Sequence, residues 1–280
     1  MSGSIAGSNK EENHMRATVN GITLQYQVSG AAIAPPVVLH HPLATDLTVW
    51  DELTAALAPH YRVVRFDARG HGKSDAPKGA YTFETLAADA IGLMDHLGLT
   101  KARFLGLSMG GMVGQYLGLL HPERFHSLCL VSTASRMPPE GRSLWDERIR
   151  NASTLGMTSV VDGALARWLS EDAMKNKPAL VARLRQMIAN TPPDGYIGWG
   201  HAIRDLDITD RIAGIRLPVR AIVGALDPAT PPSAAEAIKG KIAGADLIVM
   251  PGVSHMLQVE APEAFHGHVL PFLAAHGPAS

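Results

Sequence analysis

A serine at the junction of a strand and a helix constrains the fold of this chain more than any other feature. In the stretch RFLGLSMGGMVGQY, residues 103–116, the spacing of apolar residues changes near Ser108 from the period of a strand to that of a helix. Residues 106–110 (GLSMG) have the form G-x-S-x-G. Its small residues permit a tight turn that exposes the serine hydroxyl above a sheet. The pattern therefore predicts that Ser108 is held for chemistry.

Strand and helix patterns alternate on both sides of this turn. Asn20 and Gly21 separate two alternating apolar segments, which predicts an N-terminal antiparallel hairpin. Buried strand patterns such as PPVVLHH and YRVVRFD then alternate with helical ones. This order is typical of a mostly parallel central sheet with helices on both faces. We expect an α/β fold whose core is made of residues 15–134 and 216–280.

Residues 135–215 interrupt the alternation. They carry helical patterns such as SVVDGALARWLS and ALVARLRQMIA, separated by Pro and Gly, which predicts a helical cap inserted into the core. Residues 1–14 are small and polar, and we expect them to be a disordered tail or an expression scar. A length of 280 residues suits one core with an insertion.

Composition argues against several classes of partner and cofactor. The 25 Lys and Arg residues are balanced by 26 Asp and Glu, so there is no basic excess for nucleic acid. The sequence has neither an apolar run of about 18 residues for a membrane span nor the apolar centre of a secretory signal. The single Cys129 lies in an apolar strand pattern and is expected in the core. Scattered histidines and the lack of a P-loop lysine predict no metal and no nucleotide cofactor. We expect a cytoplasmic protein that acts on a small molecule.

A serine hydroxyl is a weak nucleophile, and it needs a base that is itself oriented by a carboxylate. In such a sheet these residues follow later strands at the same edge, the acid before the histidine. Asp227 comes shortly after the strand pattern VRAIVGA, and His255 after DLIVM. Asp67 also follows a strand, but it precedes the serine and is expected to brace a loop. The predicted catalytic residues are Ser108, Asp227 and His255.

Acyl transfer also needs two N–H groups for the developing oxyanion. One is expected to be the backbone N–H of Met109, directly after the serine. The other should come from the loop after the early strand, where His41, Pro42 and Leu43 follow. Because proline has no N–H, the predicted donor is Leu43, unless this loop is only the entry to a helix. His41 is expected to line the site.

These residues carry a resemblance to the α/β-hydrolases, and several stretches resemble one branch, the 3-oxoadipate enol-lactonases of aromatic-acid catabolism. The resemblance covers nearly the whole chain from residue 15. Widely shared stretches are RFDARGHGKSDAPKGAYT and GLSMGGMVGQYLG, and a more telling one is PPDGYIGWGHAIRDLDI in the predicted cap. The chain departs from that branch in the loop at residues 41–44 and at Trp199 and Gly200, which are expected to face the pocket.

By this resemblance Ser108, Asp227 and His255 match the catalytic positions of the family. The resemblance implies hydrolysis of a small ester or lactone, most directly 3-oxoadipate enol-lactone, through an acyl-enzyme. A carboxylesterase, a carbon–carbon bond hydrolase, a cofactor-free haloperoxidase and a ligand-binding receptor without turnover remain open. Haloalkane dehalogenation is disfavoured because it needs a carboxylate in place of Ser108.

A lactone of that pathway carries a carboxylate, and an anion in a partly dry pocket needs a cationic partner. Arg136 is the predicted partner, because it lies nearest the sheet edge that should carry Ser108. Further predicted contacts with the substrate are Trp145 and Trp168. The insertion also carries Arg148 and Arg167, and the alternative for all three arginines is that they lie on solvated helix faces.

Overall fold

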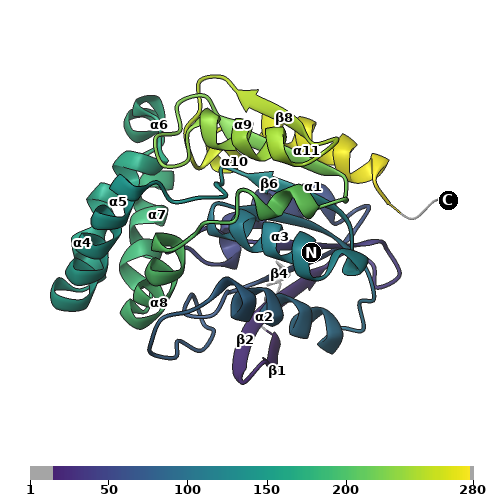
Figure 1. The fold of residues 1–280 in the computed structure, drawn as a ribbon, viewed down its shortest axis with the longest axis horizontal. Helices are drawn as coiled ribbons and strands as arrows, with labels where there is room; N and C mark the ends of the chain where they lie inside the picture. Colours follow the sequence, from purple (N-terminus) through teal and green to yellow (C-terminus); the bar gives the residue numbers. More distant parts are fainter. Residues whose placement is uncertain (1–14, 278–280) are drawn as a thin grey trace, which may run out of the picture.

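The computed structural model describes residues 15–277. The tail predicted at residues 1–14 lies outside the described residues. Within the described part, the centre is an 8-stranded sheet in the order β1-β2-β4-β3-β5-β6-β7-β8. β1 (Met15–Val19) pairs antiparallel with β2 (Ile22–Ser29), and β2 pairs antiparallel with β4 (Arg62–Phe66). All the other pairs are parallel, so the predicted fold class is confirmed (Figure 1).

The N-terminal hairpin forms where the sequence pattern places it. Asn20 and Gly21 both adopt positive φ, 47° and 77°. Such a two-residue turn matches the right-handed twist of the strands that it joins. Its register pairs Val19 with Ile22, and both side chains are buried.

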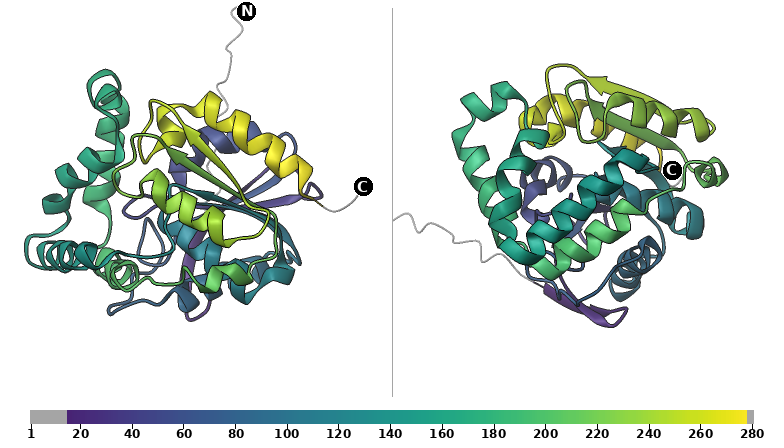
Figure 2. Two further views of the ribbon diagram at one scale, coloured as in Figure 1. Left: turned by 45° about the horizontal axis from the view of Figure 1, so that its top comes forward. Right: turned by 60° about the vertical axis from the view of Figure 1, so that its left-hand side comes forward.

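The remaining strands and the helices of the core alternate along the chain. The strands are β3 (Pro36–His40), β5 (Ala102–Leu107), β6 (Phe125–Val131), β7 (Val219–Gly224) and β8 (Asp246–Met250). The α-helices are α1 (Asp51–Leu57), α2 (Phe83–His96), α3 (Met109–Leu120), α9 (Pro232–Lys241), α10 (Leu257–Glu260) and α11 (Pro262–Ala275). Short 3₁₀ helices are η1 (Leu47–Trp50), η2 (Pro122–Arg124), η3 (Met157–Val160) and η4 (Arg211–Gly214). Helices α2 and α3 pack together on one face of the sheet, whereas α1 and α11 pack together on the other (Figure 2).

The centre of the sheet is apolar on both faces. All the residues of β5 are buried, as a central parallel strand covered by helices requires. Cys129, in the neighbouring β6, is also buried, as its sequence context predicts. No helix within residues 15–277 is long and apolar enough to span a membrane.

The helices between β6 and β7 gather at one end of the sheet, as Figure 1 and the left view of Figure 2 show. They are α4 (Pro139–Leu155), α5 (Val161–Trp168), α6 (Glu171–Asn176), α7 (Pro178–Asn190) and α8 (Pro193–Arg204). We propose that they act together as a cap over the carboxyl ends of the parallel strands, and we call residues 135–215 the cap.

Trp199 fixes cap helix α8 to the core, which differs from the expectation that it faces the pocket. Its side chain is fully buried, and its indole N–H donates to the carbonyl of Arg69 (2.7 Å). Beside it, the backbone of Gly195 packs against that of Gly70, so closely that a Cβ on Gly195 would lie 1.9 Å from the Gly70 oxygen. Trp199 is therefore part of the contact between cap and core.

Candidate active site

Ser108 stands on a strained turn between β5 and α3. Its backbone φ is 56° and its ψ is −113°, a conformation that costs a residue with a side chain about 1–3 kcal/mol. The surrounding backbone imposes it: the Ser108 N–H donates to the Val131 carbonyl (2.8 Å), and the Ser108 carbonyl accepts from the Thr133 hydroxyl (2.8 Å). The turn thus places the serine side chain at the carboxyl end of the central strand.

The two outer glycines of the G-x-S-x-G pattern are required by close backbone contacts. A Cβ on Gly106 would lie 2.2 Å from the Gly110 carbonyl oxygen. A Cβ on Gly110 would lie 2.4 Å from the carbonyl oxygen of His40 in β3. Larger residues would push the start of α3 away from the strands and displace Ser108.

His255 and Asp227 meet at the same edge of the sheet. His255 follows β8 and Asp227 follows β7, and the imidazole Nδ1 lies 2.8 Å from Asp227 Oδ2. Because carboxylate oxygens only accept hydrogen bonds, this nitrogen must carry the proton, which leaves Nε2 as the basic nitrogen of a neutral ring. Both side chains are buried.

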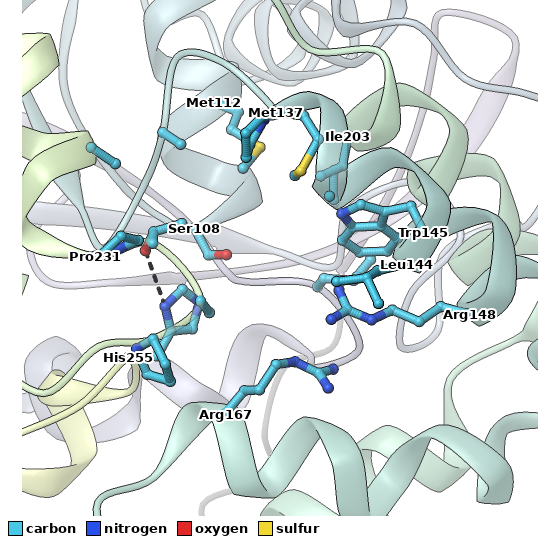
Figure 3. Close-up of a pocket in the computed structure, with 18 of the residues that line it drawn as sticks. Ser108, Met112, Met137, Leu144, Trp145, Arg148, Arg167, Ile203, Pro231 and His255 are labelled. Carbon is cyan, nitrogen blue, oxygen red and sulfur yellow. Dashed lines mark hydrogen bonds between the residues drawn. The ribbon is translucent and has the colours of Figure 1, made fainter.

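Thr230 completes the surroundings of this pair, and sequence reasoning missed it. Its hydroxyl donates to Asp227 Oδ2 (2.8 Å) and lies 3.2 Å from His255 Nδ1, the hydrogen bond drawn at His255 in Figure 3. The other oxygen of Asp227 accepts from the N–H groups of Ala229 (2.8 Å) and Thr230 (3.0 Å). Burial opposes ionisation of Asp227, but His255 and these hydrogen bonds outweigh it and hold the pKa of the carboxyl below its usual value.

Ser108 and His255 line the same cavity (Figure 3). Within the described residues, no hydrogen bond joins the Ser108 hydroxyl to His255. Such contacts are often long before substrate binds and shorten in the complex. The structure therefore brings the three predicted residues to one edge of the sheet, with Ser108 and His255 both lining the cavity.

The two predicted oxyanion donors both lie near Ser108: Met109 follows it in the chain, and Leu43 comes from a separate loop. Met109 is the first residue of α3, and Leu43 lines the same cavity as Ser108. In the described part of the chain, neither backbone N–H has a hydrogen-bond partner. The residue after Leu43, Ala44, has φ of 54°, and its N–H donates to His71 Nε2 (2.9 Å). The loop that carries Leu43 is thereby fixed.

His41 braces this loop from within and does not line the cavity, which corrects the expectation that it contacts substrate. It is fully buried. Its Nε2 accepts from the Ala68 N–H (2.9 Å), and its Nδ1 lies 2.8 Å from the Pro42 carbonyl. With both ring nitrogens occupied by the backbone, the side chain has no group left for a ligand. Asp67 braces the neighbouring loop, as its sequence position predicts, by accepting from the N–H groups of Leu47 and Lys73 (2.8 Å each).

The cavity has a volume of about 550 Å³ and lies between the cap and the carboxyl edge of the sheet. Trp145 and Trp168, both predicted substrate contacts, line it. Apolar residues form much of the wall near Ser108, and they include Met112, Met137 and Ile203 (Figure 3). Within residues 15–277, no three His, Cys, Asp or Glu side chains are grouped as a metal site requires.

Arg136 lines this cavity but is already neutralised. Its Nε donates to Asp207 Oδ1 (3.0 Å), and more than half of its side chain is exposed. The structure therefore differs from the expectation that Arg136 is the free cation of the pocket.

Two other arginines point into the cavity. Arg148 of α4 lies across it from Ser108 and His255, and the guanidinium of Arg167 from α5 also turns inward (Figure 3). In the described part of the chain, neither makes an ion pair or hydrogen bond with a carboxylate, although Arg148 lies over the Trp145 ring (4.9 Å to the centroid). Burial lowers the pKa of Arg148, and burial together with the charge of Arg148 lowers the pKa of Arg167 to about 10. The cavity thus holds two partly desolvated cations.

Comparison with known proteins agrees with this architecture. Residues 35–262 match the family model described as the alpha/beta hydrolase fold. The chain is 32% identical over 249 residues to 3-oxoadipate enol-lactonase 2 of Acinetobacter baylyi. The aligned region covers 89% of this chain and 92% of that protein.

Two solved structures are similar over almost their whole length. The enol-lactonase of Burkholderia xenovorans LB400 has a TM-score of 0.90 and 39% identity, covering 93% of this chain and 100% of the other. A thermophilic esterase of Thermogutta terrifontis has a TM-score of 0.89 and 28% identity, covering 94% and 99%. The expected family resemblance is confirmed: the chain belongs to the α/β-hydrolase fold family and is a hydrolase similar to the 3-oxoadipate enol-lactonases.

Proposed function

We propose that this protein hydrolyses a small ester or lactone that carries a carboxylate, 3-oxoadipate enol-lactone or a close relative, through an acyl-enzyme on Ser108. The observation that carries the substrate class is the pair of inward-facing arginines, Arg148 and Arg167, neither ion-paired with a carboxylate in the described part of the chain. They lie in the same cavity as the serine and the histidine, so one ligand can contact both ends.

In the first half of the reaction, the Ser108 hydroxyl attacks the carbonyl carbon while His255 Nε2 takes its proton. Asp227 holds the imidazole by the 2.8 Å contact at Nδ1 and stabilises the positive charge that forms on the ring. The backbone N–H groups of Leu43 and Met109 receive the oxyanion. Collapse of the intermediate breaks the ester bond, and His255 returns its proton to the leaving oxygen.

In the second half, water replaces the alcohol. His255 removes a proton from water as the water oxygen attacks the acyl carbon, and the same two N–H groups receive the second oxyanion. Ser108 leaves with the proton from the imidazolium, and the free acid is released. For a lactone, the two new groups stay on one molecule, because the ring has only been opened.

The electrostatics of the cavity favour an anion at the end away from Ser108. Arg148 and Arg167 are partly buried, so a bound carboxylate would stabilise their charges. A guanidinium can hold a carboxylate by two parallel hydrogen bonds. The apolar wall between this end and the serine suits the short carbon skeleton of a small lactone. The similarity to enol-lactonases supports the same class.

Substrate discrimination tests this proposal. Arg148→Ala and Arg167→Ala should each raise KM for the anionic enol-lactone by about tenfold to a hundredfold, equivalent to losing a hydrogen bond to a charged group. Hydrolysis of a neutral p-nitrophenyl ester should change little, because that ester has no carboxylate. Arg150→Ala is the matched control, since Arg150 is exposed on the same helix and does not line the cavity.

Two outcomes would contradict the assignment. Equal losses on both substrates would show structural damage instead of anion binding. A wild-type enzyme that prefers neutral esters, with no effect of either arginine on any anionic lactone, would instead indicate a carboxylesterase; the similar Thermogutta terrifontis structure is that of an esterase.

A further inference from the structure

The loop that carries His255 is held on both sides of the histidine by groups outside the loop. The N–H of Ser254 donates to Glu260 Oε1 (3.1 Å). The N–H of Met256 donates to the carbonyl of Trp168 in the cap (3.0 Å). The backbone on each side of the proposed base is therefore fixed, once by a side chain and once by the cap.

Glu260 joins this loop to the cap through a single buried carboxylate. Its Oε2 accepts from the hydroxyl (2.5 Å) and the N–H (3.3 Å) of Ser170, the residue that caps helix α6. Its Oε1 accepts from Ser254, so the two oxygens hold opposite sides of the contact. The side chain takes no part in the cavity, and 8% of the residue is exposed.

Burying the Glu260 carboxylate costs free energy that an apolar residue at this position would not cost. A buried carboxylate loses its hydration, and hydrogen bonds must replace it. An apolar residue would fill the same space without that cost, but it would leave the Ser254 N–H buried without an acceptor. What the polar side chain supplies, and an apolar residue cannot, is a hydrogen-bonded link of fixed length between the cap and the backbone next to His255.

We propose that Glu260 is a positioning residue for His255, which sets the imidazole against Asp227 and Ser108 by clamping the Ser254 N–H to Ser170 of the cap. This inference rests on the proposed function, because it assumes that His255 is the base. If the clamp is released, the loop can shift and the contact of the imidazole with Asp227 lengthens from 2.8 Å. Misplacing a reacting group by about 1 Å can cost about a hundredfold in rate.

The test compares three variants on a neutral p-nitrophenyl ester, which does not depend on the arginines. Glu260→Ala removes both acceptors and should lower kcat by about tenfold to a hundredfold with little change in KM, since binding is untouched. Glu260→Gln should retain more of kcat than Glu260→Ala, because its amide oxygen can still accept from the Ser254 N–H and its NH₂ can donate to the Ser170 hydroxyl, although the weaker bond from the Ser170 N–H is lost. Lys177→Met is the matched control: Lys177 donates from the cap to the backbone carbonyl of Glu260 (2.6 Å) and does not touch the carboxylate.

The pH dependence of kcat/KM separates positioning from general stability. In Glu260→Ala the pH profile of kcat/KM should change, because a displaced imidazole is no longer held at the same distance from Asp227. Glu260→Gln and Lys177→Met should keep the wild-type profile. If Glu260→Ala does not fold, Glu260→Asp takes its place, because its shorter side chain cannot span Ser170 and Ser254 together.

The outcomes that would overturn the inference are distinct from those that test the proposed function. A fluorophosphonate probe should label Ser108 in the wild-type protein, and failure to label it would overturn the proposed function itself. With labelling intact, the clamp is rejected in two cases. In one, folded Glu260→Ala or Glu260→Asp keeps wild-type kcat and pH profile; in the other, Glu260→Gln and Lys177→Met lose as much kcat as Glu260→Ala.

Discussion

The indole of Trp168 and the imidazole of His255 lie nearly parallel, with ring centroids 6.4 Å apart and planes inclined by 25°. Trp168 ends cap helix α5, whereas His255 follows the last strand of the sheet. The carbonyl of Trp168 also accepts from the N–H of the residue after His255. The cap thus contacts the proposed base through both a side chain and its backbone.

Substitution of Trp168 should affect both stability and turnover. Trp168→Ala leaves a cavity beside His255, and we expect it to lower the free energy of unfolding by about 3 kcal/mol, near the lower end for buried aromatic residues because the ring also lines the pocket. Trp168→Phe keeps a ring against the imidazole and should retain most of kcat. Urea unfolding and ester hydrolysis measure the two effects. An unchanged kcat and stability in Trp168→Ala would show that the stacked contact has no role.

Asp227→Asn tests the proposed orienting acid. An amide cannot stabilise the imidazolium and favours the wrong tautomer, so kcat should fall by about a thousandfold to ten-thousandfold while the protein stays folded. Asp205→Asn and Asp207→Asn are controls, because both residues are half exposed and pair with arginines of the cap region. Near-normal kcat in Asp227→Asn, with a large loss in either control, would show that the orienting acid is a residue of the cap and not Asp227.

The fold follows from patterns that are local in the sequence. The Asn20–Gly21 turn, the buried run of β5 and the change of period at Ser108 each depend on a few adjacent residues. Details within an element are less local: the helical segment at residues 47–57 begins as the 3₁₀ turn η1, where Asp46 accepts from the Thr48 N–H, and only then becomes α1. The positions of Asp227 and His255 follow from the rule that the ends of parallel strands share one edge.

The residues that sequence reasoning missed depend on packing between distant segments. The directions of Arg148 and Arg167 are set by how α4 and α5 lie on the core, which periodicity within one helix does not report. His41 follows a strand, which is where residues that contact a ligand are expected. Its ring nevertheless lies in the interior, where Nε2 accepts from the N–H of Ala68. Thr230 had a weak local signal, a hydroxyl three residues after an aspartate, at a spacing that lets it turn back on the carboxylate.

Arg136→Ala tests whether Arg136 binds the carboxylate of the substrate, as the sequence predicts, or stays paired with Asp207, as in the structure. Because Arg136 is exposed and paired with Asp207, its removal should leave KM for an anionic lactone nearly unchanged. The effect should be much smaller than that of Arg148→Ala under the same conditions. A loss of lactone affinity in Arg136→Ala, with neutral esters unaffected, would show that the substrate displaces Asp207 from this guanidinium.

Buried histidines should make the folded state sensitive to acid. Burial lowers the pKa of His40, His41 and His71 to about 3, from 6.5, and charge repulsion among them adds to the effect. The unfolded chain therefore binds more protons below about pH 6.5, so stability is complete above that pH and is lost as pH falls toward 3, by up to about 1.4 kcal/mol per pH unit for each imidazole. Burial also raises the pKa of Asp67, to about 6, and the pKa of Asp89, so these two carboxyl groups act in the opposite sense to the three imidazoles. Urea unfolding at a series of pH values measures this slope.

Two matched variants test whether the buried histidines cause this dependence of stability on pH. His71→Gln removes a titrating group and leaves an acceptor for the Ala44 N–H, so the dependence on pH should become shallower. His60→Gln, at an exposed position, should leave it unchanged. A wild-type stability that is flat between about pH 7 and pH 4 would contradict the neutral state of these imidazoles in the fold.

The most direct test of the proposed function is the site of acylation. The reaction with a p-nitrophenyl ester is stopped rapidly in acid, and the mass of the protein and of its peptides is measured. We predict a mass increase equal to one acyl group, confined to the peptide that contains Ser108. In Ser108→Ala the increase should be absent and kcat lower by about a thousandfold or more. An acyl group on another residue, or a Ser108→Ala variant that keeps more than about a tenth of wild-type kcat, would contradict the account.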